Sequence, residues 1–305
     1  MAETSTTNSK DQVATEVRTD LENQRREADK QIRPEVETQR KEAQQRAEKT
    51  LDREAVAAIE QTERAVNALS ENRPDEALAA IEQATGKINI LLSRNPSTAL
   101  IPVNLSVAVI DMAPWKIEDI SVLKSTAETA LEFDELPAAR AALDALRSEI
   151  RVRTYNLPLA TYPTALQDAA RLIDEKKTRE ASNLLLIALN TLAVVDQVIP
   201  LPLLATRRYL HEAQERAQKD KDAAERLLDT ADHELERTIE LGYTSRDEVY
   251  KALRDEIRDL RKQLKGNKDM TSVFAGLKEK LTSLIRRRSE KQERSDAQNQ
   301  PQKAA

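Results

Sequence analysis

The sequence has no cysteine, four glycines and an aromatic content of 3%. Without cysteine the chain has no disulfide, no thiolate nucleophile and no cysteine metal ligand. The scarcity of glycine and aromatic residues, together with 33% charged residues, predicts long solvated helices and argues against sheet-rich and loop-rich folds. No apolar run reaches the roughly 18 residues that span a bilayer, and residues 1–30 lack the apolar stretch of a secretory signal. We therefore expect a cytoplasmic protein, or a periplasmic one if a signal has been removed.

The sequence motifs of nucleotide-dependent and metal-dependent enzymes are also absent. The chain contains no GxGxxG, P-loop or HExxH motif. Its two histidines, His211 and His233, lie on predicted helices with no serine or threonine on a strained turn nearby, so we expect ordinary surface histidines. Carboxylates such as Glu234 and Glu236 are expected in solvated pairs with basic residues one helical turn away. We therefore predict no catalytic, cofactor-binding or metal-binding residue and no enzymatic activity.

Charge and length narrow the class of protein further. The 48 basic residues are outnumbered by 53 acidic ones, which gives a net charge of -5. Because a chain of this sign repels a phosphate backbone, nucleic acid is not an expected partner. A length of 305 residues exceeds that of a usual single domain and fits one large domain with extensions.

Apolar residues recur at helical spacing between residues 53 and 265. They indicate pairs of helices that turn at residues 71–74, near Pro137 and at residues 174–177. Two apolar stretches alternate with the two-residue period of a strand, at residues 103–109 and 150–153. The fold is therefore predicted to be mainly α, with helical hairpins packed as one core and a short two-stranded β-element.

Two charged extensions flank the predicted core. Residues 1–52 form a polar tail and a charged helical arm, in which Pro34 is expected to break or kink the helix. Residues 266–305 contain a basic amphipathic helix and a disordered tail. The stretch 269–294 fits an anionic membrane surface or an acidic partner. Docking of that helix on the core, or self-association, is an equally open alternative.

Candidate binding residues are the polar and aromatic ones beside the proline-bearing stretches. In a binding site they would line a pocket where the hairpins meet. The alternative is that the aromatic residues anchor the core and the polar ones cap the backbone. The candidates are Trp115, Tyr155, Asn156, Tyr162, Asn190, Asp196, Arg207 and Tyr209.

Three segments resemble the bacterial YfdX family. They are Asn156-Leu157-Pro158-Leu159-Ala160-Thr161-Tyr162-Pro163, Ala188-Leu189-Asn190-Thr191-Leu192 and Ile199-Pro200-Leu201-Pro202-Leu203-Leu204. The resemblance covers about residues 65–262. It implies a mainly helical, self-associating protein linked to stress, with a binding or chaperone-accessory role and no catalytic residues. The enteric members are associated with acid stress and drug tolerance.

Two functions follow as the main hypotheses, and an enzyme with an unfamiliar pocket is a third, weaker one. The first is a non-enzymatic stress-response protein that forms a homo-oligomer and binds a protein partner. Its assembly would respond to pH, because its many carboxylates lose their charge in acid. The second is a helical scaffold that presents a peptide-binding groove and uses its extensions as docking arms.

Overall fold

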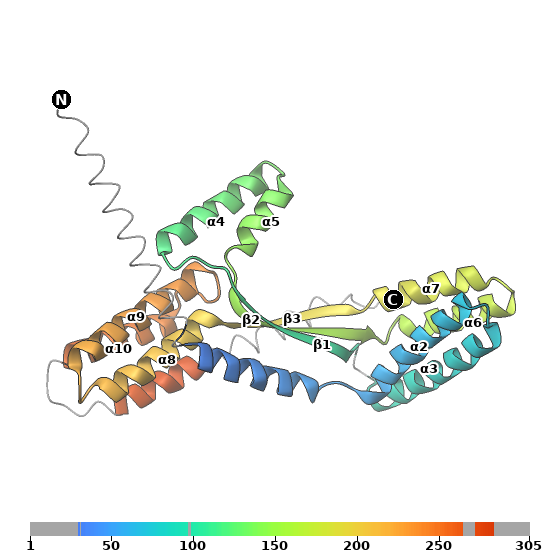
Figure 1. The fold of residues 1–305 in the computed structure, drawn as a ribbon, viewed down its shortest axis with the longest axis horizontal. Helices are drawn as coiled ribbons and strands as arrows, with labels where there is room; N and C mark the ends of the chain where they lie inside the picture. Colours follow the sequence, from blue (N-terminus) through green and yellow to red (C-terminus); the bar gives the residue numbers. More distant parts are fainter. Residues whose placement is uncertain (1–29, 31, 97–98, 265–271, 284–305) are drawn as a thin grey trace. The chain divides into compact units, whose positions relative to one another are not determined.

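The computed structural model describes residues 30, 32–96, 99–264 and 272–283 (Figure 1). Within these residues the fold is mainly helical, as predicted, with one small antiparallel sheet. The chain divides into two compact units. Unit 1 comprises the described residues of Met1–Arg40, Val109–Ile150 and Ile199–Glu290, and unit 2 those of Lys41–Ala108 and Arg151–Val198.

Unit 2 is built from two helical hairpins. The first consists of α2 (Arg53–Ser70) and α3 (Pro74–Arg94), and the second of α6 (Tyr162–Asp174) and α7 (Thr178–Asn190). Helix α2 packs against α7, and α3 packs against α6, so the four helices lie side by side (Figure 1). The buried faces are rich in alanine, and small side chains let helix backbones approach closely. These alanines are Ala55, Ala58, Ala65, Ala68, Ala77, Ala80, Ala84, Ala169, Ala181 and Ala188.

The start of α2 is set by a side-chain cap. The carboxylate of Asp52 accepts hydrogen bonds from the backbone amides of Glu54, at 2.8 Å, and Ala55, at 3.2 Å. These amides have no partner within the helix, so the cap satisfies them. At the other end of the hairpin, α3 begins with Pro74, whose missing amide proton costs nothing in the first turn of a helix.

All three predicted hairpins are present and share one turn geometry. In each turn a residue other than glycine has a left-handed backbone, and the next amide donates to a carbonyl five residues earlier. In the α6–α7 turn, for example, the amide of Lys177 donates to the carbonyl of Leu172 at 2.8 Å. This bonding pattern closes a helix and reverses the chain within a few residues. The left-handed residues are Asn72, Asp134 and Lys176, with φ of 58°, 57° and 62°.

The sheet has three strands, so the predicted two-stranded element was incomplete. Strands β1 (Leu100–Asp111) and β2 (Ser148–Pro158) are the two expected ones, and β3 (Ala193–Pro200) pairs with the other edge of β2. Strand β3 lacks the expected period because most of its side chains are half-buried and only Ile199 and Pro200 are fully buried. Each strand contributes residues to both units.

Unit 1 contains α4 (Ile117–Glu132), α5 (Leu136–Asp144), α8 (Leu201–Arg216), α9 (Lys221–Glu240) and α10 (Glu248–Gln263). Its hydrophobic cluster is separate from that of unit 2, whereas the sequence predicted one core. The reason is that helical spacing identifies a buried face but not the helix that covers it. Members of the cluster outside the predicted core limits of 53–265 are Ile32, Phe274, Leu277 and Leu281.

Parts of both predicted extensions therefore belong to the folded structure. Residue 30 and residues 32–48 are helical, so the described residues on both sides of Pro34 are helical and the helix is not broken at this proline. Residues 272–283 are helical, and their apolar face packs against the unit 1 cluster. This agrees with docking on the core, and it removes that face from contact with a membrane. The predicted tails at the two ends of the chain lie outside the described residues, as do residues 10–29 of the arm and residues 269–271 and 284–294 of the basic helix.

Candidate binding surface

The eight predicted binding residues do not form one pocket within either unit. Five of them lie in unit 2: Tyr155, Asn156, Tyr162, Asn190 and Asp196. The other three lie in unit 1: Trp115, Arg207 and Tyr209. Their contacts within each unit show what each side chain does.

In unit 2, two of the predicted residues link neighbouring strands. Both carboxylate oxygens of Asp196 on β3 accept hydrogen bonds from the guanidinium of Arg153 on β2, each at 2.7 Å. The hydrogen bond from Arg153 lowers the pKa of Asp196. The side-chain amide of Asn156 donates to the backbone carbonyl of Ala193 at 3.0 Å. These contacts stabilise the pairing of β2 with β3.

The other three residues of unit 2 belong to its core or its surface. Tyr162, at the start of α6, is buried in the hydrophobic cluster, and burial raises its pKa to about 12. Tyr155 is half-buried and packs against the same cluster. Asn190 is exposed at the end of α7. Tyr162 and Tyr155 therefore contribute to the packing of unit 2.

In unit 1, Trp115 packs against two side chains of α9. Its ring centroid lies 4.8 Å from that of His233, and the guanidinium carbon of Arg237 lies 5.2 Å from the indole centroid. His233 Nε2 is 3.0 Å from the backbone carbonyl oxygen of Trp115. Because a carbonyl only accepts, this contact requires that Nε2 carries the proton and donates it. The cluster fixes the segment that leads into α4 against α9.

A buried ion pair lies under the indole ring. The Nη1 atom of Arg237 donates to both carboxylate oxygens of Glu234, at 3.0 and 2.8 Å, and the two side chains are 7% and 2% exposed. Arg237 Nε also donates to the backbone carbonyl of Pro114 at 3.2 Å. The sequence predicted that Glu234 forms a solvated pair. That prediction was wrong because spacing along a helix does not reveal which face another segment covers.

His233 is half-buried and packs on Trp115, so it is not the ordinary surface histidine that the sequence predicted. Burial lowers its pKa below the ordinary value of 6.5, and the hydrogen bond to the Trp115 carbonyl opposes this in part. The nearby charge of Arg237 lowers the pKa further, and Glu118 and Asp232 raise it by smaller amounts. As the pH falls below 6.5, the unfolded chain therefore takes up a proton before the folded chain does. Stability from this group is present above that pH and is lost as the pH falls through the folded pKa.

We expect the substitution His233→Gln to reduce the dependence of stability on pH. The parent chain should lose free energy of unfolding between about pH 7 and pH 5, and the variant should lose less. Urea denaturation at several pH values in this range measures the difference. Equal slopes in the two proteins would contradict the assignment of the pH dependence to His233.

The predicted residues of unit 1 line two separate cavities. Trp115 and Tyr209 line one of about 10 Å³, far below the roughly 300 Å³ of a typical small-molecule site. Arg207 on α8 forms an ion pair with Glu35 on the helix of residues 32–48. These two residues line an open pocket of about 280 Å³ together with Arg208, His211 and Lys278.

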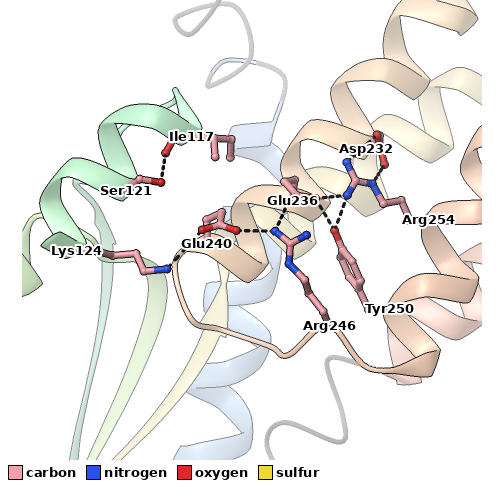
Figure 2. A network of polar contacts seen from close by, with 9 residues as sticks. All are labelled: Ile117, Ser121, Lys124, Asp232, Glu236, Glu240, Arg246, Tyr250 and Arg254. Atoms are coloured by element: carbon pink, nitrogen blue, oxygen red, sulfur yellow. Dashed lines mark hydrogen bonds and ion pairs between the residues drawn. The ribbon is translucent and has the colours of Figure 1, made fainter.

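A polar network joins three helices of unit 1 (Figure 2). Arg246, before α10, contacts Glu236 and Glu240 on α9, and Arg254 on α10 contacts Asp232 and Glu236. The hydrogen bond from Arg246 is the main cause of the lowered pKa of Glu240. On α4, Lys124 pairs with Glu240 at 3.4 Å. The network therefore attaches α4 to the α9–α10 pair.

The attached element, the α4–α5 hairpin, carries a surface that the sequence did not single out. An open groove of about 560 Å³ lies between the two helices. Close to it along the chain are Phe133, which is 73% exposed, and Val122, which is 63% exposed and lines the groove. The other residues that line it are Ser121, Ser125, Thr126, Thr129, Ala130, Glu135 and Ala138.

In the part of the chain that the structure describes, no group of three or more histidine, aspartate or glutamate side chains is placed to hold a metal ion. None of the described helices combines the length and the apolar character that crossing a membrane requires.

Comparison with known proteins agrees with the family resemblance. Residues 58–198 match the family model described as YfdX protein. A solved structure of YfdX from Salmonella Typhi is similar at 18% identity and a TM-score of 0.34, covering 50% of this chain and 93% of that one. No curated protein matches the chain. The chain therefore contains, at residues 58–198, a segment that matches the YfdX family.

Proposed function

We propose that this chain is a non-enzymatic stress-response protein that associates with itself, binds a protein partner and responds to pH. The observation that carries the proposal is the exposed apolar surface of the α4–α5 hairpin. Phe133 and Val122 are large apolar side chains that the described residues leave largely uncovered. Exposed apolar side chains gathered around a groove are typical of a surface for protein contact.

The contacts of the hairpin with α9 support a response to pH. The segment before α4 is held by Trp115, which packs on His233, and α4 itself is held by the pair of Lys124 with Glu240. Protonation of His233 places a second positive charge beside Arg237. Glu240 keeps the charge that attracts Lys124 in mild acid, because its pKa is lowered from the ordinary value of 4.5. Mild acid therefore weakens the attachment through Trp115, and the segment that leads into α4 should respond first.

The pairing of charged groups inside each unit supports a role without catalysis. Glu234 is held by Arg237, and Asp196 is held by Arg153. A general acid or base needs a group that reaches a reacting atom in a pocket. Both carboxylates instead serve contacts between elements of the fold.

The proposed function is tested by light scattering coupled to size-exclusion chromatography at about pH 7 and about pH 5. We expect a mass above the 34.3 kDa of the single chain and a change of mass between the two pH values. The variant His233→Gln should show a smaller change than the parent. A single chain at both pH values, with no protein bound, would overturn the proposal.

A second candidate function is a helical scaffold that presents a groove to peptides. The groove between α4 and α5 favours it, because helices of partner proteins commonly bind with their apolar face in such a groove. The structure changes the role expected for the C-terminal docking arm. The apolar face of residues 272–283 is occupied by the unit 1 cluster, so this stretch acts as part of the folded unit.

A further inference from the structure

The α4–α5 hairpin differs from the other two hairpins in what covers it. In unit 2, α2 packs on α7 and α3 packs on α6, so each hairpin covers the other. In unit 1, α4 contacts α9, but among the described residues no second hairpin covers the groove side. Phe133 and Val122 have the two largest exposed fractions among the large apolar side chains that the structure describes.

The exposed surface follows one face of α4. Val122, Thr126, Thr129 and Phe133 are spaced by four, three and four residues, which places them on the same side of a helix. This stripe contains no charged residue and is about 16 Å long at 1.5 Å per residue. A stripe of this length matches about three turns of a partner helix that carries apolar residues at the same spacing.

The charge of the hairpin determines which helix fits. Residues 117–144 contain seven carboxylates and two basic residues, which gives a net charge of -5. One of the two basic residues, Lys124, is already paired with Glu240. By contrast, the α6–α7 hairpin, residues 162–190, has four acidic and four basic residues and no net charge. The α4–α5 hairpin is therefore an uncharged stripe within an acidic surface.

We propose that the α4–α5 groove binds a basic amphipathic helix of a partner protein. This inference rests on the proposed function of partner binding and specifies the chemistry of the partner. The apolar face of the helix would cover Val122, Thr129 and Phe133, and its lysine or arginine side chains would face the surrounding carboxylates. Two copies of the same acidic hairpin would repel each other, so a second α4–α5 hairpin fits the groove less well.

The test uses three synthetic peptides and the full chain. The first peptide is a helix of leucine and lysine with an apolar stripe at helical spacing. The second replaces each lysine with glutamate, and the third scrambles the first so that it keeps its charge and loses its stripe. Fluorescence anisotropy with labelled peptides should show binding of the first peptide only, and added salt should weaken it.

Substitutions at exposed positions locate the binding without disturbing the core. Phe133→Ser and the charge reversal Glu135→Lys should each weaken binding of the first peptide by about tenfold. The matched control is Ile187→Ser on α7, where a 59% exposed apolar side chain lies far from the groove in sequence and in the other unit. The control should bind the peptide as the parent does, and circular dichroism should show that all variants remain folded.

The alternative outcomes separate this inference from the proposed function. No binding of the first peptide, equal binding of the glutamate peptide, or binding that Phe133→Ser leaves unchanged would each overturn the groove assignment. Loss of self-association in Phe133→Ser would identify a second copy as the occupant. That result would overturn the basic helix and leave the proposed function standing. If the peptide binds to a chain that stays monomeric at both pH values, the groove assignment stands and the proposed self-association is overturned.

Discussion

The substitution Arg237→Met should lower the free energy of unfolding by about 3–5 kcal/mol, because it removes the cation that is paired with the buried carboxylate of Glu234. The methionine keeps much of the apolar volume beside Trp115, so loss of the charge is the main change. Arg237 also donates to the carbonyl of Pro114, and that hydrogen bond is lost as well. Urea denaturation followed by the fluorescence of Trp115, the single tryptophan of the chain, measures the effect.

The matched control for this prediction is Arg246→Met. Arg246 also contacts two carboxylates of α9, Glu236 and Glu240, but its side chain is 53% exposed. Water replaces the lost contacts of an exposed ion pair, so the control substitution should lower the free energy of unfolding by at most about 1 kcal/mol. Similar losses in the two variants would show that the Glu234–Arg237 pair is not shielded from solvent in solution.

The substitution Leu185→Ala should lower the free energy of unfolding by about 2–5 kcal/mol, because it opens a cavity in the unit 2 cluster. Leu185 on α7 is fully buried among the side chains of that cluster. The residue after it, Leu186, is 43% exposed and provides a control on the same helix. Leu186→Ala should lower the free energy of unfolding by less than about 1 kcal/mol. Thermal and urea denaturation followed by circular dichroism compare the two variants.

An equal loss in the two leucine variants would contradict the assigned face of α7. The comparison is informative because both substitutions remove the same atoms from neighbouring positions of one helix. Their effects on helix propensity and on the unfolded chain are therefore nearly the same. Only the difference in burial remains to explain a difference in stability.

The helices and two of the strands could be predicted because their periodicity is local. Ala77, Ala84 and Ile88 mark the buried face of α3 by their spacing alone, and Val103 alternates with polar neighbours in β1. Strand β3 has no such period, because most of its side chains are half-buried whichever face they are on. The division into two clusters depends on which faces meet, and a single sequence does not contain that information.

The exposed surface of the α4–α5 hairpin could not be predicted, because its exposure also depends on which faces meet. Tyr162 and Trp115 stood out as aromatic residues beside prolines, yet both have contacts inside their units. Phe133 and Val122 have the spacing of an ordinary amphipathic helix, so nothing in the sequence distinguishes them from core residues. The sequence shows that a helix has an apolar face. Whether the same chain covers that face is decided by tertiary packing.

Because the segments of the two units alternate along the chain, the gene cannot be divided into one part for each unit. Unit 1 takes residues from three separate stretches, and the stretches of unit 2 lie between them. No single cut therefore yields a gene fragment that encodes one complete unit. A fragment limited to residues 53–265 loses Ile32 and Phe274 from the unit 1 cluster. Recombination of these units between related genes would need several crossovers at once, so the two units are expected to be inherited together.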